Sequence, residues 1–294
     1  MPLLESEAQA ARQELEAAVA LYDPARHAGH VLLFGQDPGV TSQCYLTFTQ
    51  WMRGLPDQAD AALSAAMRIA EPLNHPFTTA WPKAFRTVLH SYRNEPEQAL
   101  AAAEDLVAFS LEQQQRYWLA AGIIVRGWGL AHFGKVEEGI AMMQAGIAGY
   151  AATGAGVSLP HFYGLLTEIL LAEGRLDEAE TNLERAFVAL RANKEGVSES
   201  TLWRIKGALL EARRPGDLAE AIACYRAAVD LPRASAVLAP RLRAATALHG
   251  ALARRGRDGL LGSPLPGLLA RYPAEITTPD LREARAALEA MPVR

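Results

Sequence analysis

A short turn motif recurs along this chain at a nearly constant interval. Its copies read GLPDQA from residue 54, NEPEQA from 94, GKVEEG from 134 and GRLDEA from 174, each 40 positions after the last. A fifth copy, GDLAEA from residue 216, follows 42 positions later. Self-similarity at a period of about 20 to 50 residues is typical of repeat proteins, and it constrains the fold more than any local pattern does.

Each copy has the composition of a junction between two antiparallel helices. A glycine or asparagine ends the first helix, because these residues tolerate the left-handed backbone of a helix C-terminus. Acidic residues follow that can cap the second helix or oppose its dipole, namely Asp57, Glu97, Glu137, Asp177 and Asp217. Small residues that let the two helices approach closely come next, namely Ala59, Ala99, Gly139, Ala179 and Ala221. Because capping explains the acidic residue of every copy, we reject an interpretation of the adjacent carboxylates as catalytic pairs.

Composition favours an all-helical protein with a soluble, cytoplasmic location. Half of the 294 residues are hydrophobic, and strand-favouring runs of Val, Ile and Thr are scarce. The net charge is −4 and no basic tract stands out, which argues against nucleic acid as a partner. Cys44 and Cys224 lie far apart without metal-like companions, as expected in a reducing compartment. The sequence shows neither a signal peptide nor an apolar run of about 18 residues, so no membrane association is expected.

The pattern predicts one domain over residues 1–294, a right-handed α-solenoid of stacked antiparallel helix pairs. An N-terminal helix and connector are expected at 5–36, and atypical capping helices at 234–294, because the terminal repeats of a solenoid must meet water on one face. The five helix pairs between them are expected at 37–74, 75–115, 116–157, 158–198 and 199–233.

The helix pairs resemble the tetratricopeptide repeat. In that family a small residue at position 8 of the first helix packs against small residues at positions 20 and 27 of the second. The matching sets are Gly127, Gly139 and Gly146; Thr167, Ala179 and Ala186; and Thr47, Ala59 and Ala66. The spacing of about 40 residues exceeds the roughly 34 of the family and its proline near position 32 is mostly absent, which implies longer helices and linkers.

A wider resemblance covers residues of about 7 to 290. Blocks such as GQDPGV at 35–40, HPFTTA at 75–80, RGWGLAHFGKVEEGI at 126–140 and TTPDLREARAAL at 277–288 are similar to the C-terminal region of large bacterial signalling proteins. Those proteins join a class III nucleotide cyclase domain, an ATPase domain and a tetratricopeptide tail. The resemblance implies a regulatory tail, since this sequence has no Walker A loop and no cyclase aspartate pair. The resemblance also implies that an upstream ATPase or cyclase domain is one partner. The chain itself is expected to be either a stand-alone relative or an excised module.

A binding face is expected on the first helix of each pair, because these helices line the inner surface of such a solenoid. In tetratricopeptide repeats, certain positions of the first helix face the groove. The residues at the equivalent positions of this sequence are aromatic and polar candidates for binding. These are Phe48, Trp51, Trp81, Tyr92, Trp128, His132, His161, Glu168, Trp203 and Lys206. The alternative is that they pack neighbouring repeats against each other.

Three classes of function remain open. The first is a non-enzymatic protein-interaction or sensor module that binds a peptide or domain. The second is a small-ligand receptor with a pocket between the aromatic inner face and the glycine-rich third repeat. The third is an enzyme, although the seven histidines are scattered and form no catalytic set with serine, cysteine or aspartate. No cofactor or metal is expected, and a homodimer through the uncapped first helix is a further expectation.

Overall fold

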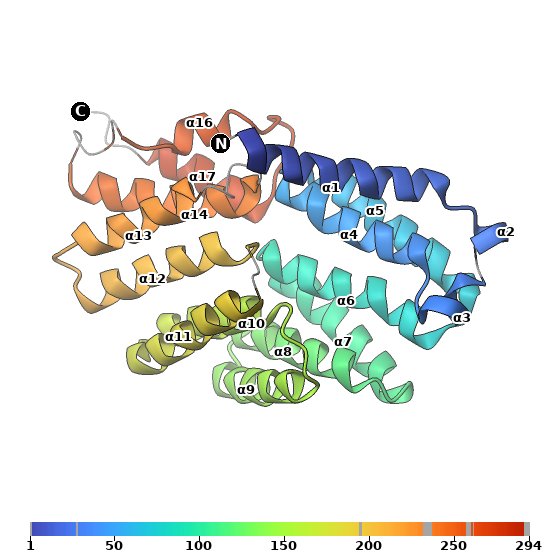
Figure 1. The fold of residues 1–294 in the computed structure, drawn as a ribbon. Coiled ribbons are helices and arrows are strands. Elements are labelled where there is room, and N and C mark those ends of the chain that lie inside the picture. The colour runs from blue at the N-terminus through green and yellow to red at the C-terminus, as the bar shows by residue number, and fades with distance from the viewer. Residues whose placement is uncertain are drawn as a thin grey trace. The chain divides into compact units, whose positions relative to one another are not determined.

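The computed structural model describes residues 2–27, 29–193, 196–231, 237–256, 260 and 262–290. These residues form helices joined by turns, with no strand among them, and consecutive helices pack against each other within residues 38–152 and within residues 159–254 (Figure 1). The prediction of an all-helical fold is therefore confirmed. The contacts divide the chain into two compact units, Met1–Ala155 and Gly156–Arg294. A single domain therefore remains a prediction.

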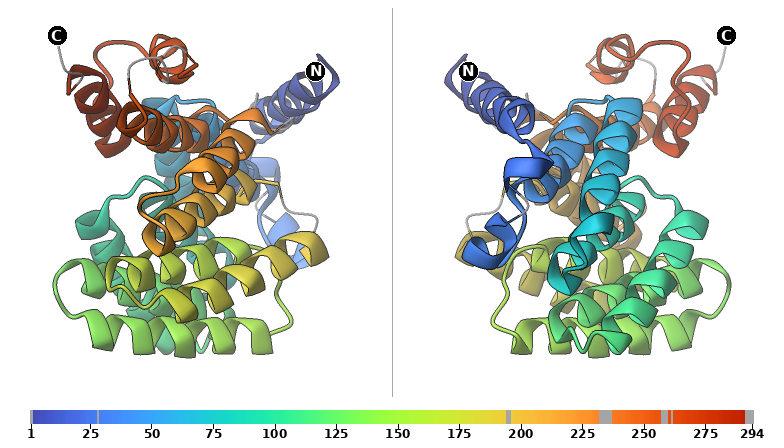
Figure 2. Two further views of the ribbon diagram at one scale, coloured as in Figure 1. Left: turned by 90° about the vertical axis from the view of Figure 1, so that its left-hand side faces the viewer. Right: turned by 90° about the vertical axis from the view of Figure 1, so that its right-hand side faces the viewer.

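The first unit contains three complete helix pairs behind an N-terminal segment. The pairs are α4–α5, α6–α7 and α8–α9, and we call α4, α6 and α8 the leading helices; each contacts the next (Figures 1 and 2). The bounds are α1 (Pro2–Leu21), α2 (Pro24–His27), α3 (His30–Phe34), α4 (Pro38–Met52), α5 (Pro56–Ala70), the 3₁₀ helix η1 (Glu71–Leu73), α6 (Pro76–Tyr92), α7 (Pro96–Glu112), α8 (Arg116–His132) and α9 (Val136–Ala152).

The second unit continues the pattern with α10–α11 and α12–α13, followed by α14, α16 and α17. Its leading helices α10, α12 and α14 also contact one another in order. The bounds are α10 (Leu159–Ala172), α11 (Leu176–Asn193), α12 (Glu199–Arg213), α13 (Ala219–Asp230), α14 (Leu238–Arg254), α16 (Leu265–Leu269) and α17 (Pro279–Glu289). The predicted repeat boundary at 233/234 lies outside the described residues.

Four of the five repeated turns share one backbone geometry. Their first residues have positive φ angles, 78° at Gly54, 55° at Asn94, 85° at Gly134 and 69° at Gly174. In each turn the next amide donates to a carbonyl five residues back, as Leu55 does to Gln50 at 3.0 Å, Glu95 to His90 at 3.0 Å, Lys135 to Leu130 at 3.0 Å and Arg175 to Leu170 at 2.9 Å. This is the Schellman geometry that ends helices at a left-handed residue. The fifth copy differs, because Gly216 is not among the residues with positive φ.

The acidic residues of the turns act mostly through the helix dipole rather than as caps. The residues at the N-cap positions of α5, α7 and α9 are Leu55, Glu95 and Lys135, and their side chains make no capping hydrogen bond. Asp57, Glu97 and Glu137 lie instead in the first turns, where a negative charge opposes the positive helix end. The capping expectation is met at the fifth turn, where the Asp217 carboxylate accepts from the amide of Ala219 at 3.1 Å.

Small residues bring the helices of each pair into close contact. Ala59, Ala99, Ala179 and Ala221 are fully buried at the phase expected from the sequence. In the glycine-rich third pair, a Cβ on Gly127 would lie 2.6 Å from the carbonyl oxygen of Gly139. Only glycine allows α8 and α9 to approach so closely, which explains the glycines by helix contact.

The second unit ends in helices that enclose one hydrophobic core. Tyr225 of α13, Leu242 of α14, Leu265 of α16 and Leu281 of α17 are all buried in it. Thr278 caps α17, its hydroxyl accepting from the amide of Leu281 at 3.3 Å. Among the described residues no helix has the length and apolarity needed to cross a bilayer.

Candidate functional site

Aromatic rings from the leading helices of the first unit form a continuous row centred on Trp81. The Trp81 ring stacks on Phe85 with centroids 5.5 Å apart and meets Tyr45 of α4 at 5.9 Å. On its other side it meets Trp118 of α8 at 5.6 Å and Phe77 at 6.4 Å. We call these five residues and Phe48, whose ring lies 5.0 Å from Phe85, the aromatic row.

The aromatic row is only partly covered by the rest of its unit. Tyr45 and Phe77 are 48% and 39% exposed. Phe48, Trp81 and Phe85 are half-buried, and only Trp118 is buried. The row therefore presents apolar ring surface to solvent across α4 and α6, which is typical of an interaction surface.

Two indole N–H groups in the row have no hydrogen-bond acceptor. The Nε1 atoms of Trp81 and Trp118 are buried and unpartnered. A buried donor without an acceptor costs about 1–3 kcal/mol, so most native structures supply one. The row thus contains two buried donors that the residues around them do not satisfy.

Three of the predicted groove residues in the first unit are buried instead of facing a groove. Trp51, Tyr92 and Trp128 are only 5%, 7% and 2% exposed. The rings of Trp51 and Tyr92 lie 4.9 Å apart between α4 and α6, and the Trp128 ring lies 4.5 Å from that of the exposed His132. Burial favours the alternative interpretation, that these three residues pack neighbouring repeats.

In the second unit, two further candidates lie beside charged residues of the leading helices. Glu168 of α10 accepts a hydrogen bond from Arg204 of α12. His161 of α10 is 4% exposed, and burial together with the positive charge of Arg243 lowers the His161 pKa to about 3. Arg243 of α14 donates to Asp280 of α17 at 2.7 Å. These two pairs connect α10 to α12 and α14 to α17. His161 is uncharged at neutral pH.

The remaining two candidates lie together on α12 and are partly accessible. Trp203 is half-buried against Phe187 of α11, with ring centroids 5.4 Å apart. The Lys206 ammonium lies 5.0 Å from the centre of the Trp203 ring. This is a cation–π contact of the kind that orders an aromatic side chain at a surface.

Sequence reasoning did not select four members of the aromatic row: Tyr45, Phe77, Phe85 and Trp118. The signal was present on α6, because Phe77, Trp81 and Phe85 recur at every fourth position. Residues four apart share one face of a helix, so this spacing predicts an aromatic stripe. The family positions used for selection follow the groove of shorter repeats and include only Trp81 of that stripe.

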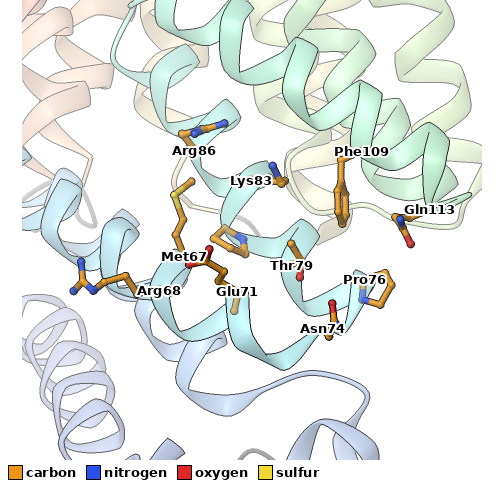
Figure 3. A pocket seen from close by; sticks show the side chains of 12 residues that line it. Met67, Arg68, Glu71, Asn74, Pro76, Thr79, Lys83, Arg86, Phe109 and Gln113 are labelled. Atoms are coloured by element: carbon orange, nitrogen blue, oxygen red, sulfur yellow. The ribbon is translucent and has the colours of Figure 1, made fainter.

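A separate pocket of about 480 Å³ lies between α5, η1, α6 and α7 of the first unit (Figure 3). Lys83 and Phe109 lie next to each other in it, with the lysine ammonium 5.3 Å from the centre of the ring. Its other lining residues are Met67, Arg68, Ala70, Glu71, Asn74, Pro76, Thr79, Pro82, Arg86 and Gln113. The pocket is not in the position that the sequence suggested, beside the glycine-rich third repeat.

The chemistry of the described residues provides no centre for a metal or a reactive thiol. No group of three or more histidine, cysteine, aspartate or glutamate side chains is placed to hold a metal ion in the part of the chain that the structure describes. Both cysteines are free and buried, and burial raises the pKa of the Cys44 thiol far above its usual value. A thiol that stays protonated is a poor nucleophile.

Comparison with known proteins places the chain beside part of a much longer one. No family model matches the sequence. The chain is 24% identical over 232 residues to an uncharacterized protein of Rhizobium meliloti strain 1021. The match covers 78% of this chain and 22% of that protein, so the chain spans about a fifth of its relative's length.

Proposed function

We propose that the chain is a non-enzymatic regulatory module of bacterial signal transduction that binds a protein or peptide partner on its leading helices. In this proposal the pairs stack as a right-handed, tetratricopeptide-like solenoid in the cytoplasm, and the aromatic row lies on the inner, partner-facing surface. The observation that carries it is the exposure of Tyr45 and Phe77 beside the half-buried ring of Trp81. Rigid aromatic side chains give large contact area at low entropic cost, which is why they dominate binding hot spots.

The length of the relative supports a partner encoded with the module. The matched region is 22% of the Rhizobium meliloti protein, so most of that protein lies outside it. An upstream ATPase or cyclase domain is accordingly the first partner to test, either in the same polypeptide or in a separate one. Pairing with a second copy of the chain remains the other candidate for the same surface.

Site-specific photo-crosslinking in cells tests the proposal. A photoreactive phenylalanine analogue at Phe77 is expected to form an adduct with one defined protein. The same analogue at Phe133, a 56% exposed residue that directly follows α8, is the matched control and is expected not to form that adduct. Equal adducts at both positions, or none at Phe77, would contradict a binding role for the aromatic row.

A second candidate function is a small-molecule receptor. The observation that favours it is the pocket of about 480 Å³ in the first unit. That volume lies within the roughly 300–1,000 Å³ of small-molecule sites. The two functions are compatible, because a ligand at one face of a helix can alter binding at the other.

A further inference from the structure

The pocket lies on the side of α6 opposite the aromatic row. Lys83 is two residues from both Trp81 and Phe85, and two residues correspond to about 200° of rotation around an α-helix. The side chain that faces the pocket and the rings that face the neighbouring leading helices therefore point in opposite directions. A ligand site here is distinct from the proposed partner-binding face.

The pocket carries an excess of positive charge. Its lining includes three cationic side chains, Arg68, Lys83 and Arg86, and one carboxylate, Glu71. A second carboxylate, Asp105 of α7, pairs with Lys83 at 2.8 Å and with Arg86 at 2.6 Å. Three cations against two carboxylates leave one positive charge, which favours an anionic ligand.

Two cationic groups retain unused hydrogen-bond donors. The Nε atom of Arg86 is buried and has no acceptor. Arg68, which also lines the pocket, forms no ion pair with any residue that the structure describes, and its side chain is exposed. Guanidinium groups match carboxylates geometrically, so a carboxylate is the anionic group that best suits these arginines.

Apolar surface adjoins these charges. Phe109 offers its ring beside Lys83, while Met67 and Pro82 line the same pocket. The volume of about 480 Å³ holds a small organic molecule. We propose that this pocket binds a small organic carboxylate, with its carboxylate at Arg86 and Lys83 and an aromatic or aliphatic body against Phe109 and Met67.

Phenylacetate is the probe, because it combines one carboxylate with one aromatic body. Calorimetric titration of the full chain is expected to show saturable binding to one site at millimolar or lower concentration. The variants Arg86→Gln and Lys83→Gln are expected to bind roughly tenfold more weakly, since each loses a charge-assisted hydrogen bond. Lys135→Gln, which removes an exposed lysine outside the pocket, is the matched control and should bind like the parent chain.

A third variant keeps the test informative if either pocket substitution unfolds the chain. Asp105→Asn removes the carboxylate that competes for Lys83 and Arg86, so phenylacetate should bind at least as tightly as to the parent chain. Weaker binding to Asp105→Asn would overturn the assignment of the carboxylate to these two cations.

Two matched ligands separate the contributions of charge and ring. Phenylacetamide has the same body without the charge, and inorganic phosphate has charge without the body; both should bind at least tenfold more weakly than phenylacetate. Equal binding of either compound would overturn the proposal, as would the absence of saturable phenylacetate binding at about 10 mM.

Discussion

Gly127 of α8 and Gly139 of α9 face each other at backbone distance. A Cβ built on Gly127 would lie 2.6 Å from the Gly139 carbonyl oxygen and 3.0 Å from the side chain of Met142. The backbones of the two helices thus touch, and the third pair of the first unit depends on both residues lacking a side chain.

This contact predicts that Gly127→Ala destabilises the chain by about 1–3 kcal/mol, because the new methyl group must push two helices apart. Gly149→Ala on α9 is the matched control, since its Cβ would meet only Ala120 at 3.8 Å. Alanine has the higher helix propensity, so the control should be neutral or stabilising by up to about 1 kcal/mol. Urea unfolding followed by circular dichroism measures both. Equal effects of the two substitutions would mean that α8 and α9 are not in backbone contact.

The ion pair of Arg243 with Asp280 predicts a large effect of its removal. Its side chains are 17% and 9% exposed, and it joins α14 to α17. Arg243→Ala leaves a largely buried carboxylate without this partner, so we expect a loss of about 3 kcal/mol.

Arg213→Ala is the comparison for that variant. Arg213 pairs with Asp177 and Glu180 on the surface, where Asp177 is 95% exposed. Exposed pairs contribute little to stability, so this variant should unfold almost like the parent chain. Chemical unfolding curves would contradict the account if Arg213→Ala were the more destabilising of the two.

Burial of His161 predicts a loss of stability in acid. Its pKa is about 3 in the folded chain against 6.5 for an unperturbed histidine, because burial and the charge of Arg243 disfavour protonation. Between these values the unfolded state binds a proton that the folded state does not. The free energy of unfolding therefore falls as the pH drops below 6.5, by up to about 1.4 kcal/mol per pH unit from this group.

The variant His161→Gln isolates that contribution, because it cannot titrate. Its free energy of unfolding should vary less between about pH 6.5 and pH 5 than that of the parent chain. An unchanged slope in His161→Gln would show that His161 does not resist protonation in the folded state.

The repeat made the helix pairs and their turns predictable from the sequence. The exposure of the candidate site residues was harder to predict, because it depends on how the longer helices pack. Turn residues such as Gly54 and Gly174 act locally through their backbone conformation, so their role follows from sequence. The fifth turn does not share this backbone conformation at Gly216, because Gly216 lies several residues from the end of α12 and from the start of α13. Exposure of an aromatic ring depends instead on neighbouring helices: Trp51 and Trp128 are covered by contacts that a spacing of 40 residues does not specify.

Affinity of the purified crosslinked partner for matched variants tests the central claim most directly. Phe77→Ala and Tyr45→Ala remove exposed rings of the aromatic row, and Phe133→Ala removes an exposed ring outside it. The account predicts that each row variant weakens binding by about tenfold or more, as expected for hot-spot residues, while Phe133→Ala leaves the affinity within about twofold. Row variants that bind like the parent chain, or a Phe133→Ala variant that binds as poorly as they do, would contradict the assignment of the partner to the aromatic row.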